Sequence, residues 1–397
     1  MALPNDNKHS GLIKVGNSEL REPDYRQVLR WAKALCREPE DVLAVLSKSF
    51  DEFGDENSRK PHIERGAFKE LIWDGDQLPI EAFEWEAGLE IEILWVFGRM
   101  PNWSGSEKLP SLRMLHVNDM QLTELDLSPV PRLTILECSI NNLTKLDLAP
   151  VPGLTKLVCK LNELTELDLS PVPRLTVLDC SINYLTRLDL SPVPGLTVLG
   201  CSDNKLTELD LSPVPRLTVL ECFTNELTEL GLAPAPGLTV LDCGYNKLTE
   251  LDLSPVPGLT ELSYGGNQPT ELDLSLVPRL TVLGCSGNEL TELDLSLVPR
   301  LTALTCYRNK LNELDLSPVP RLTELWCSQN KLTKLDLSPV PGLTVLDCSG
   351  NELTELDLSP VPGLVDLACD NNELTELDLS PVPGLMMLEC YANELNE

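Results

Sequence analysis

A sequence of 21 residues repeats along most of this chain, and no other feature restricts its fold as strongly. A clear copy runs from Leu164 to Tyr184 as LTELDLSPVPRLTVLDCSINY, and thirteen such units follow without a gap from Leu122 to Glu394. A fixed period of about 20 to 50 residues is typical of solenoids, in which each unit buries its apolar face only against its neighbours. The sequence therefore predicts one long repeat array.

Each unit contains two short segments in which apolar and variable residues alternate. The pattern Leu-x-x-Leu-x-Cys at 175–180 predicts a short strand over its second half. Asn183 then suits a turn, because its side chain can hydrogen-bond to nearby backbone, and an asparagine recurs there in every unit. The segment 185–190 alternates again and ends at Ser-Pro-Val-Pro, which cannot lie inside a helix. We expect an inward asparagine ladder and an extended return segment turned by prolines.

The pattern LxxLxCxxNxL resembles the leucine-rich repeat, with cysteine where the usual form has its third leucine. It is most similar to the short bacterial repeats with a cysteine ladder, the internalin J type. The resemblance implies a horseshoe-shaped solenoid with a parallel β-sheet on its concave face and an extended, non-helical convex side. The common property of the family is a concave binding face rather than a reaction.

Residues 1–90 differ in composition from the array. Apolar residues at helical spacing follow Glu22-Pro23-Asp24 and Glu38-Pro39-Glu40, which predicts two helices, and we expect a third near Ile63 to Trp73. We interpret residues 1–90 as a small, mainly α-helical N-terminal module. Such a module either caps the exposed first strand of the solenoid or binds a partner independently.

Residues 91–121 are degenerate repeats that lead into the array, and residues 122–397 form thirteen repeats plus the start of a fourteenth. The pattern Ile-x-x-Leu-x-Val at 91–96 fits the frame of the repeat, so we expect the sheet to start near residue 91. At the other end, Leu385 to Cys390 would form a last strand with an open edge. Open strand edges invite pairing, and an end-to-end homodimer is one outcome that we consider.

Twelve of the thirteen cysteines fall 21 residues apart, from Cys138 to Cys390, and Tyr264 fills the one gap. A column spaced by one strand separation, about 4.8 Å, cannot surround a metal tetrahedrally. Parallel side chains would also keep their Cβ atoms farther apart than the ~3.8 Å that a disulfide prefers. We therefore expect buried free thiols that act as small hydrophobic residues, and a reducing compartment.

A column of aspartates, including Asp168, Asp189 and Asp210, is broken at Gly231. Calcium needs about six to eight converging oxygens, and one carboxylate per unit on a flat face does not supply them. We interpret these aspartates as solvated, or as acceptors of hydrogen bonds from the backbone of the proline corner.

The sequence gives little support for catalysis. Its three histidines are His9, His62 and His116, and no phosphate-binding, serine-hydrolase or zinc-protease motif occurs. Cys36 with His62 could form a nucleophile and base, but Cys36 lies on an apolar helical face and fits a core better. We predict no enzyme activity, no catalytic residue, no cofactor and no metal site.

The net charge of the chain is −31, which disfavours nucleic acid as a partner because phosphate binding needs clustered lysine and arginine. The charge would attract a basic protein surface, or it would serve only as a solubilising coat. No apolar run reaches the ~18 residues of a membrane span or has signal-peptide character. We expect no membrane association and a cytoplasmic location, with export by a pathway without a classical signal peptide as the alternative.

The residues that vary between units define the candidate binding site, because the framework is almost copied from unit to unit. Interface hot spots are rich in Trp, Tyr and Arg. One stretch combines all three with acidic neighbours, a second is smaller and aromatic, and a third is an apolar row. The three groups are Trp326, Tyr307 and Arg308 with Glu324 and Asp347; Phe223 with Tyr245; and Ile140, Leu161 and Ile182.

These observations favour a non-catalytic protein that binds another protein through an acidic, aromatic-containing concave face. It would be a recognition or regulatory subunit of a bacterial system. A secreted effector or surface adhesin of the internalin type is the alternative, and an architectural spacer is a third class. Trp326 could also pack flat on its neighbours and only shield the sheet.

The cysteine column gives a first testable prediction. A thiol reagent added to the native protein should label few of the thirteen cysteines, and all of them after denaturation, because buried thiols are inaccessible. Counting labelled thiols by mass spectrometry checks this. Rapid labelling of most thiols in the folded protein would show that the column does not face the core.

Overall fold

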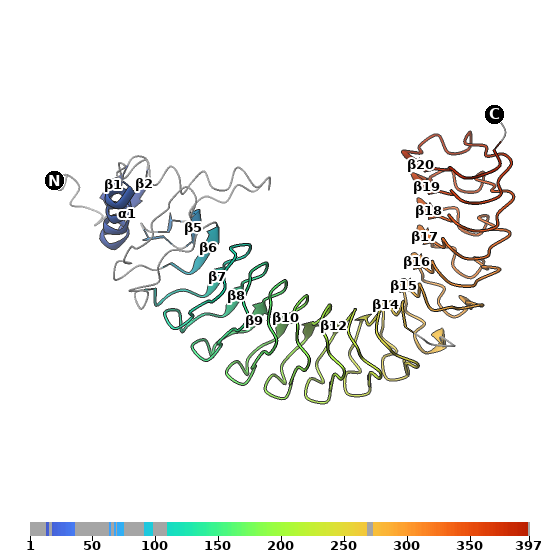
Figure 1. Cartoon of the computed structure of the whole chain (residues 1–397). Helices are drawn as coiled ribbons and strands as arrows, with labels where there is room; N and C mark the ends of the chain where they lie inside the picture. Colours follow the sequence, from blue (N-terminus) through green and yellow to red (C-terminus); the bar gives the residue numbers. More distant parts are fainter. Residues whose placement is uncertain are drawn as a thin grey trace. The chain divides into compact units, whose positions relative to one another are not determined.

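The structure is a computed structural model, and it describes residues 13–15, 18–35, 63–64, 67–68, 70–74, 91–97, 109–267 and 273–395. The chain divides into two compact units, Met1–Leu185 and Thr186–Glu397. Each unit contains a series of parallel strands with one strand per turn of the chain (Figure 1). The predicted leucine-rich repeat solenoid is therefore confirmed.

The first unit carries the N-terminal elements and the first strands of the array. Strands β1–β2 and β3–β4 are antiparallel pairs, and β5 to β10 are parallel neighbours in chain order. The elements are β1 (Ile13–Val15), β2 (Ser18–Leu20), α1 (Glu22–Leu35), β3 (Ile63–Glu64), β4 (Ala67–Phe68), β5 (Glu70–Asp74), β6 (Ile93–Phe97), β7 (Met114–His116), β8 (Ile135–Glu137), β9 (Lys156–Val158) and β10 (Val177–Asp179).

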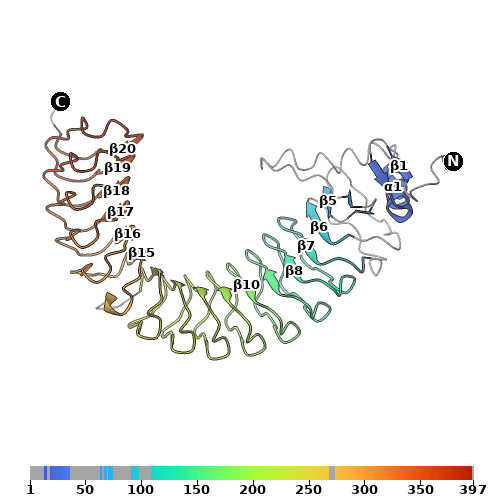
Figure 2. The ribbon, with the colours of Figure 1, turned by 180° about the vertical axis from the view of Figure 1, so that it is seen from behind.

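The second unit consists of parallel strands and their return segments. Each strand pairs with the next in chain order, and the strands lie along one side of the coil with the return segments on the other (Figure 2). The elements are β11 (Val198–Gly200), β12 (Val219–Glu221), β13 (Val240–Asp242), β14 (Glu261–Ser263), the 3-10 helix η2 (Leu274–Leu276), β15 (Val282–Gly284), β16 (Ala303–Thr305), β17 (Glu324–Trp326), β18 (Val345–Asp347), β19 (Asp366–Ala368) and β20 (Met387–Glu389).

The N-terminal region is partly helical, as α1 covers the first predicted helix. Pro23 is tolerated in the first turn, because the backbone N–H groups of a first turn have no acceptor within the helix. Asp24 stabilises the helix, since its negative charge lies near the positive end of the helix dipole. Val28 and Trp31 are fully buried on one face. The second predicted helix, at 42–53, lies outside the described residues. Whether this region caps the array or binds a partner stays a prediction.

The predicted third helix near Ile63 to Trp73 is wrong, because this segment forms β3, β4 and β5. Short apolar runs do not distinguish helix from strand, whereas the sequence Arg65-Gly66 between two such runs is typical of a β-hairpin. The expected start of the sheet near residue 91 is also wrong. Strand β5 pairs in parallel with β6, so the sheet begins one strand earlier, at Glu70.

The core is formed by columns of leucine, valine and cysteine from successive turns. The middle residue of each strand from β7 to β19 is a buried leucine, such as Leu178, which pairs in register with Leu157. The cysteine column is buried up to Cys369, and Cys390 is half-buried. Burial raises the pKa of the Cys138 and Cys285 thiols to about 12, so these thiols are neutral and poorly reactive at pH 7.

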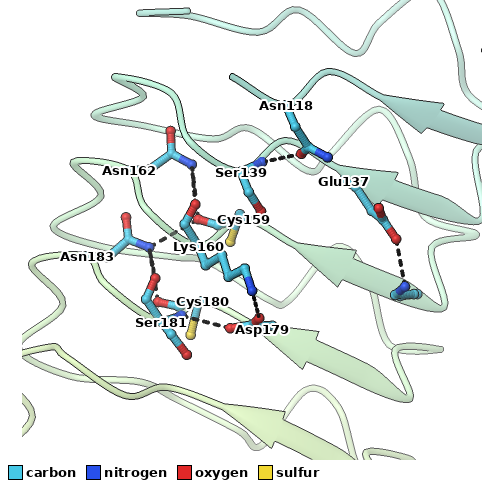
Figure 3. Close-up of polar contacts among 11 residues, drawn as sticks. Asn118, Glu137, Ser139, Cys159, Lys160, Asn162, Asp179, Cys180, Ser181 and Asn183 are labelled. Carbon is cyan, nitrogen blue, oxygen red and sulfur yellow. Dashed lines mark hydrogen bonds and ion pairs between the residues drawn. The ribbon is translucent and has the colours of Figure 1, made fainter. Parts of the chain in front are cut away.

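The predicted asparagine ladder connects adjacent turns. The Nδ2 atom of Asn183 donates to the carbonyl oxygens of Cys159 in the preceding turn (3.1 Å) and of Cys180 (3.0 Å) and Ser181 (3.2 Å) in its own turn. Its Oδ1 accepts from the backbone N–H of Leu164 at 3.0 Å. Figure 3 shows Asn183 beside Asn162. The Nδ2 atom of Asn162 donates in the same way to the carbonyl oxygens of Cys138 and Cys159. Each side chain therefore satisfies buried backbone groups of two turns at once.

The return segment turns at the prolines through two successive backbone hydrogen bonds. In one unit, the backbone N–H of Val172 donates to the carbonyl oxygen of Leu169 at 3.0 Å, and that of Leu175 donates to the carbonyl oxygen of Val172 at 3.1 Å. The aspartate of the preceding LDLS sequence fixes the first corner, since Asp168 Oδ1 accepts from Ser170 N–H at 2.9 Å. In the next unit, hydrogen bonds from the Ser191 side chain and from its backbone N–H lower the pKa of Asp189. The aspartate column therefore has the backbone-capping role that was one of its two interpretations.

The ladder predicts a large difference between two neighbouring asparagines. Asn141 is buried, and its side chain bonds to Val117 and Cys138 carbonyls and to the Met120 and Leu122 N–H groups. We expect Asn141→Ala to lower the free energy of unfolding by at least about 3 kcal/mol, because several buried groups lose their partners. Urea denaturation followed by circular dichroism measures this.

The exposed neighbour Asn142 is the matched control. Its side chain makes one long contact, 3.5 Å to Glu163 Oε1, so Asn142→Ala should change the stability by less than about 0.5 kcal/mol. Equal losses for the two variants would mean that the ladder does not hold the turns together.

Candidate functional site

The outward side chains at the first and third positions of the strands form a surface that we call the strand face. Register places these side chains next to their equivalents in the neighbouring turns, as for Thr305, Trp326 and Asp347. The framework fixes the positions, and the residues that occupy them vary. The strand faces of the two units differ in charge.

In the first unit the charges of the strand face are paired. Glu137 contacts His116 Nδ1 at 2.9 Å and Lys156 Nζ at 2.6 Å, and the His116 ring stacks on Trp95 with ring centroids 3.5 Å apart. Partial burial opposes ionisation of Glu137, but the hydrogen bond with Lys156 and the two positive charges outweigh it and lower its pKa. Lys160 likewise lies 3.8 Å from Asp179 (Figure 3). This face is locally neutralised.

In the second unit the ionisable residues of the strand face are all acidic. None of the strands β11–β20 contains lysine or arginine. The acidic positions are Glu221, Asp242, Glu261, Glu324, Asp347, Asp366 and Glu389. Arg308 lies just beyond β16, and its Nε donates to Gln329 Oε1 at 2.7 Å. A surface of this composition creates a negative potential that favours a basic partner.

The structure brings together the first group of predicted site residues. Trp326 ends β17, Glu324 begins the same strand, and Asp347 lies beside Trp326 on β18. Tyr307 and Arg308 directly follow the neighbouring strand β16 and its cysteine. All five residues therefore come from three adjacent strands and the turns after them.

The structure also joins the second predicted group to the first. The Tyr245 hydroxyl lies 3.3 Å from the Tyr307 hydroxyl, although the two residues are 62 positions apart. Phe223 meets the Tyr245 ring edge to face, with centroids 5.2 Å apart and an interplanar angle of 66°. We call Tyr245 and Tyr307 the tyrosine bridge. Phe223, Tyr245 and Tyr307 are thus connected by contacts, and Trp326 lies on the strand that follows Tyr307; we call these four residues the aromatic surface.

Two features missed in the sequence support the tyrosine bridge. A Cβ atom at Gly266 would lie 2.9 Å from carbons of the Tyr245 ring, so this ring lies directly over a glycine. Asp242 lies three residues before Tyr245 and accepts a hydrogen bond from Gly244 N–H at 3.2 Å. The consecutive glycines 265 and 266, at positions where most units carry side chains, were the signal available in the sequence.

The third predicted group, Ile140, Leu161 and Ile182, forms an exposed row in the first unit that we call the corner row. These side chains are 48%, 39% and 41% exposed. Their backbone φ angles are 57°, 56° and 55°, in the left-handed region that β-branched residues disfavour. Gly287 and Gly350 occupy the same position in other units. The corner row is held in place by the fold, but it lies apart from the aromatic surface in sequence and belongs to the other unit.

The described residues contain neither a cluster of metal-ligating side chains nor a membrane-spanning helix. No three His, Cys, Asp or Glu side chains converge to hold a metal within the part of the chain that the structure describes. In the same part, no helix combines the length and the apolar character needed to cross a bilayer. Cys36 and His62, the pair considered for catalysis, lie outside the described residues.

Comparisons with known proteins agree with this geometry. The family profile for Leucine Rich repeats (2 copies) matches residues 320–360. The functional domain of InlJ from Listeria monocytogenes, which includes a cysteine ladder, is 40% identical to this chain, with a TM-score of 0.62. The match covers 70% of this chain and 67% of that one. The chain belongs to the leucine-rich repeat family, in its cysteine-ladder form.

More distant leucine-rich repeat structures share the fold alone. A leucine-rich repeat protein of Leptospira interrogans is 24% identical over 77% of this chain and 85% of its own, with a TM-score of 0.68. YopM from Yersinia enterocolitica is 24% identical over 94% of this chain and 96% of its own, with a TM-score of 0.58. A search of curated proteins gave no match.

Asp242 gives a prediction about pH. Burial raises its pKa above the ordinary value of 3.8, so the folded state binds this proton more tightly than the unfolded chain does. At a pH above the folded-state pKa, Asp242 is a partly buried carboxylate, and this charge lowers the free energy of unfolding. At a pH below the unfolded-state pKa of about 3.9, the group is protonated in both states and the loss disappears. We expect Asp242→Asn to raise the urea midpoint at pH 7 and to leave it unchanged near pH 3.

Asp347→Asn is the control, because Asp347 holds the same strand position and accepts a similar backbone hydrogen bond, from Ser349 N–H at 3.0 Å. It reports the effect of removing one negative charge from the strand face. If Asp242→Asn lowered the midpoint at pH 7, the backbone hydrogen bond would outweigh the desolvation of the carboxylate.

Proposed function

We propose that this leucine-rich repeat protein is a non-catalytic binding protein whose second unit holds a basic protein partner on its strand face. One observation carries the proposal. The aromatic surface, which consists of Phe223, the tyrosine bridge and Trp326, lies in the same unit as a strand face that contains carboxylates and no lysine or arginine. Leucine-rich repeats are in general interaction scaffolds, which supports the broader assignment.

The two kinds of residue would have different effects on binding. Buried aromatic side chains supply most of the affinity at protein interfaces, since they remove a large area from water at a low cost in conformational entropy. The carboxylates would act over longer distances, raising the association rate and orienting a basic partner. Because exposed charges are screened by salt, the association rate should fall as ionic strength rises.

We further propose a cytoplasmic role as the recognition or regulatory subunit of a bacterial system. The cysteine column, which begins at Cys138 and contains no disulfide among the described residues, supports a reducing compartment, where thiols stay reduced. The similar proteins reported above are bacterial, which supports the bacterial origin.

A secreted effector or surface adhesin of the internalin type is the second candidate. The 40% identity to the InlJ domain favours it, because that protein carries the same cysteine ladder. Fractionation of the native host, followed by immunodetection in cytosol, cell surface and medium, separates the two. A mainly extracellular protein would overturn the cytoplasmic role and leave the binding face in place.

Trp326 gives the main test of the binding face. We expect Trp326→Ala to weaken binding of a co-purified partner by at least 1 to 2 kcal/mol, or roughly five- to thirtyfold, as for an interface hot spot. Isothermal titration calorimetry measures the loss, and circular dichroism should show an unchanged fold. Tyr184, an exposed aromatic residue of the first unit, provides the control variant Tyr184→Ala, which should bind normally.

The double variant Trp326→Ala, Tyr307→Ala gives the decisive outcome. If it kept full affinity for the partner, the strand face of the second unit would not be the site. The residues before the array would then become the favoured binding region. An unchanged affinity of Trp326→Ala alone would support the simpler view that this ring only shields the sheet.

A further inference from the structure

The tyrosine bridge differs from the rest of the aromatic surface because its rings are fixed from several sides. Tyr245 contacts Phe223 at its edge, lies over Gly266, and meets the Tyr307 hydroxyl at 3.3 Å. Tyr245 nevertheless remains 45% exposed. The rings are therefore held in one arrangement before any partner arrives, so binding to them costs little further side-chain entropy.

The bridge crosses turns whose side chains are small or absent. Ser286 lies one turn before Tyr307 at the equivalent position, and Tyr307 must lean back across it to reach Tyr245. Ser286 is only 6% exposed, and its hydroxyl has no hydrogen-bond partner among the described residues. A buried polar group without a partner is unfavourable. Ser139, at the equivalent position of another repeat, has a hydroxyl in the same state, so this cost belongs to the repeat position rather than to the bridge.

The charges near the bridge define what it can hold. Asp242 ends β13, three residues before Tyr245, and is partly buried. Its carboxylate hydrogen-bonds to Gly244 N–H and to the Ser263 side chain, and it forms no ion pair with a lysine or arginine of the described residues. Glu221 lies beside it on β12, and Glu261 begins the neighbouring strand β14. Aromatic faces next to carboxylates favour a cation that is planar and weakly hydrated, which describes the guanidinium of arginine better than the ammonium of lysine.

We propose that the tyrosine bridge is the seat of an arginine side chain of the protein partner. The guanidinium stacks on the exposed faces of Tyr245 and Tyr307, and its N–H groups donate to the Asp242 carboxylate. This inference rests on the proposed function, because it names the residue that a basic partner presents to the same strand face. It differs from that function in requiring arginine rather than positive charge alone.

The test uses fluorescein-labelled hexa-arginine and hexa-lysine peptides and the full chain, with affinity measured by fluorescence anisotropy at physiological salt. The two probes carry equal charge, so steering by the carboxylates affects both. We expect hexa-arginine to bind about tenfold more tightly than hexa-lysine, since stacking on two tyrosines favours guanidinium. The Tyr245→Leu, Tyr307→Leu variant should bind both peptides equally.

Two glycines provide a matched pair of variants. Gly266 and Gly287 have nearly the same left-handed backbone, with φ of 68° and 67°. An added Cβ at Gly266 would meet the Tyr245 ring at 2.9 Å, whereas at Gly287 the nearest atom is backbone at 3.7 Å. Both alanine variants therefore carry similar backbone strain, but only Gly266→Ala should displace Tyr245 and remove the preference for arginine.

The outcomes separate this inference from the proposed function. Equal binding of both peptides to the wild-type chain, or an arginine preference that survives Gly266→Ala and the double tyrosine variant, would overturn the arginine seat. The acidic face and the Trp326 test would then stand unchanged. If neither peptide bound, the arginine seat would be overturned together with the basic character of the partner.

Discussion

The hydrogen bonds of the buried asparagines hold each turn of this protein to the next, and the rest of the structure depends on them. Each asparagine satisfies backbone groups of two turns, as Asn183 does for Cys159 and Leu164. An isolated turn would lack these hydrogen bonds and would expose its apolar face to water, which is why the units fold only as an array. Because the ladder fixes the backbone after every strand, the outward residues are free to vary without loss of the fold.

The outward residues differ in charge and in aromatic content between the two units. In the first, Glu137 and Asp179 lie beside lysines, and the exposed large hydrophobic residues among those described are the corner row and Tyr184. In the second, the carboxylates of the strand face have no basic neighbours on the strands, and the aromatic surface belongs to the same unit. Neutralised charge contributes little to long-range attraction, whereas charge of one sign steers a partner. The difference favours the second unit as the binding region.

Several residues of these surfaces conflict with local stability. Ile182 adopts a left-handed backbone where other units have glycine, and Ser286 has a buried hydroxyl without a partner. The neighbouring turns tolerate these costs because each is small compared with the packing of the repeated core. Such conflicts concentrate at functional surfaces in proteins whose framework is otherwise locally consistent. The framework and the binding face are therefore subject to separate constraints within one 21-residue unit.

The sequence by itself determined the repeat, the strand at each turn, the inward cysteines and the asparagine ladder, because a strict period gives every unit the same environment. It failed at Ile63 to Trp73, where strands replaced the expected helix, since short apolar runs without a period fit either structure. It named Phe223, Tyr245, Tyr307 and Trp326 as site residues but separated them into two groups. Only the tertiary structure joined them, because the contact between Tyr245 and Tyr307 depends on side chains leaning across turns whose own side chains are absent or small. Periodicity fixes the position of each backbone segment, whereas the direction of a surface side chain is decided by its neighbours in space.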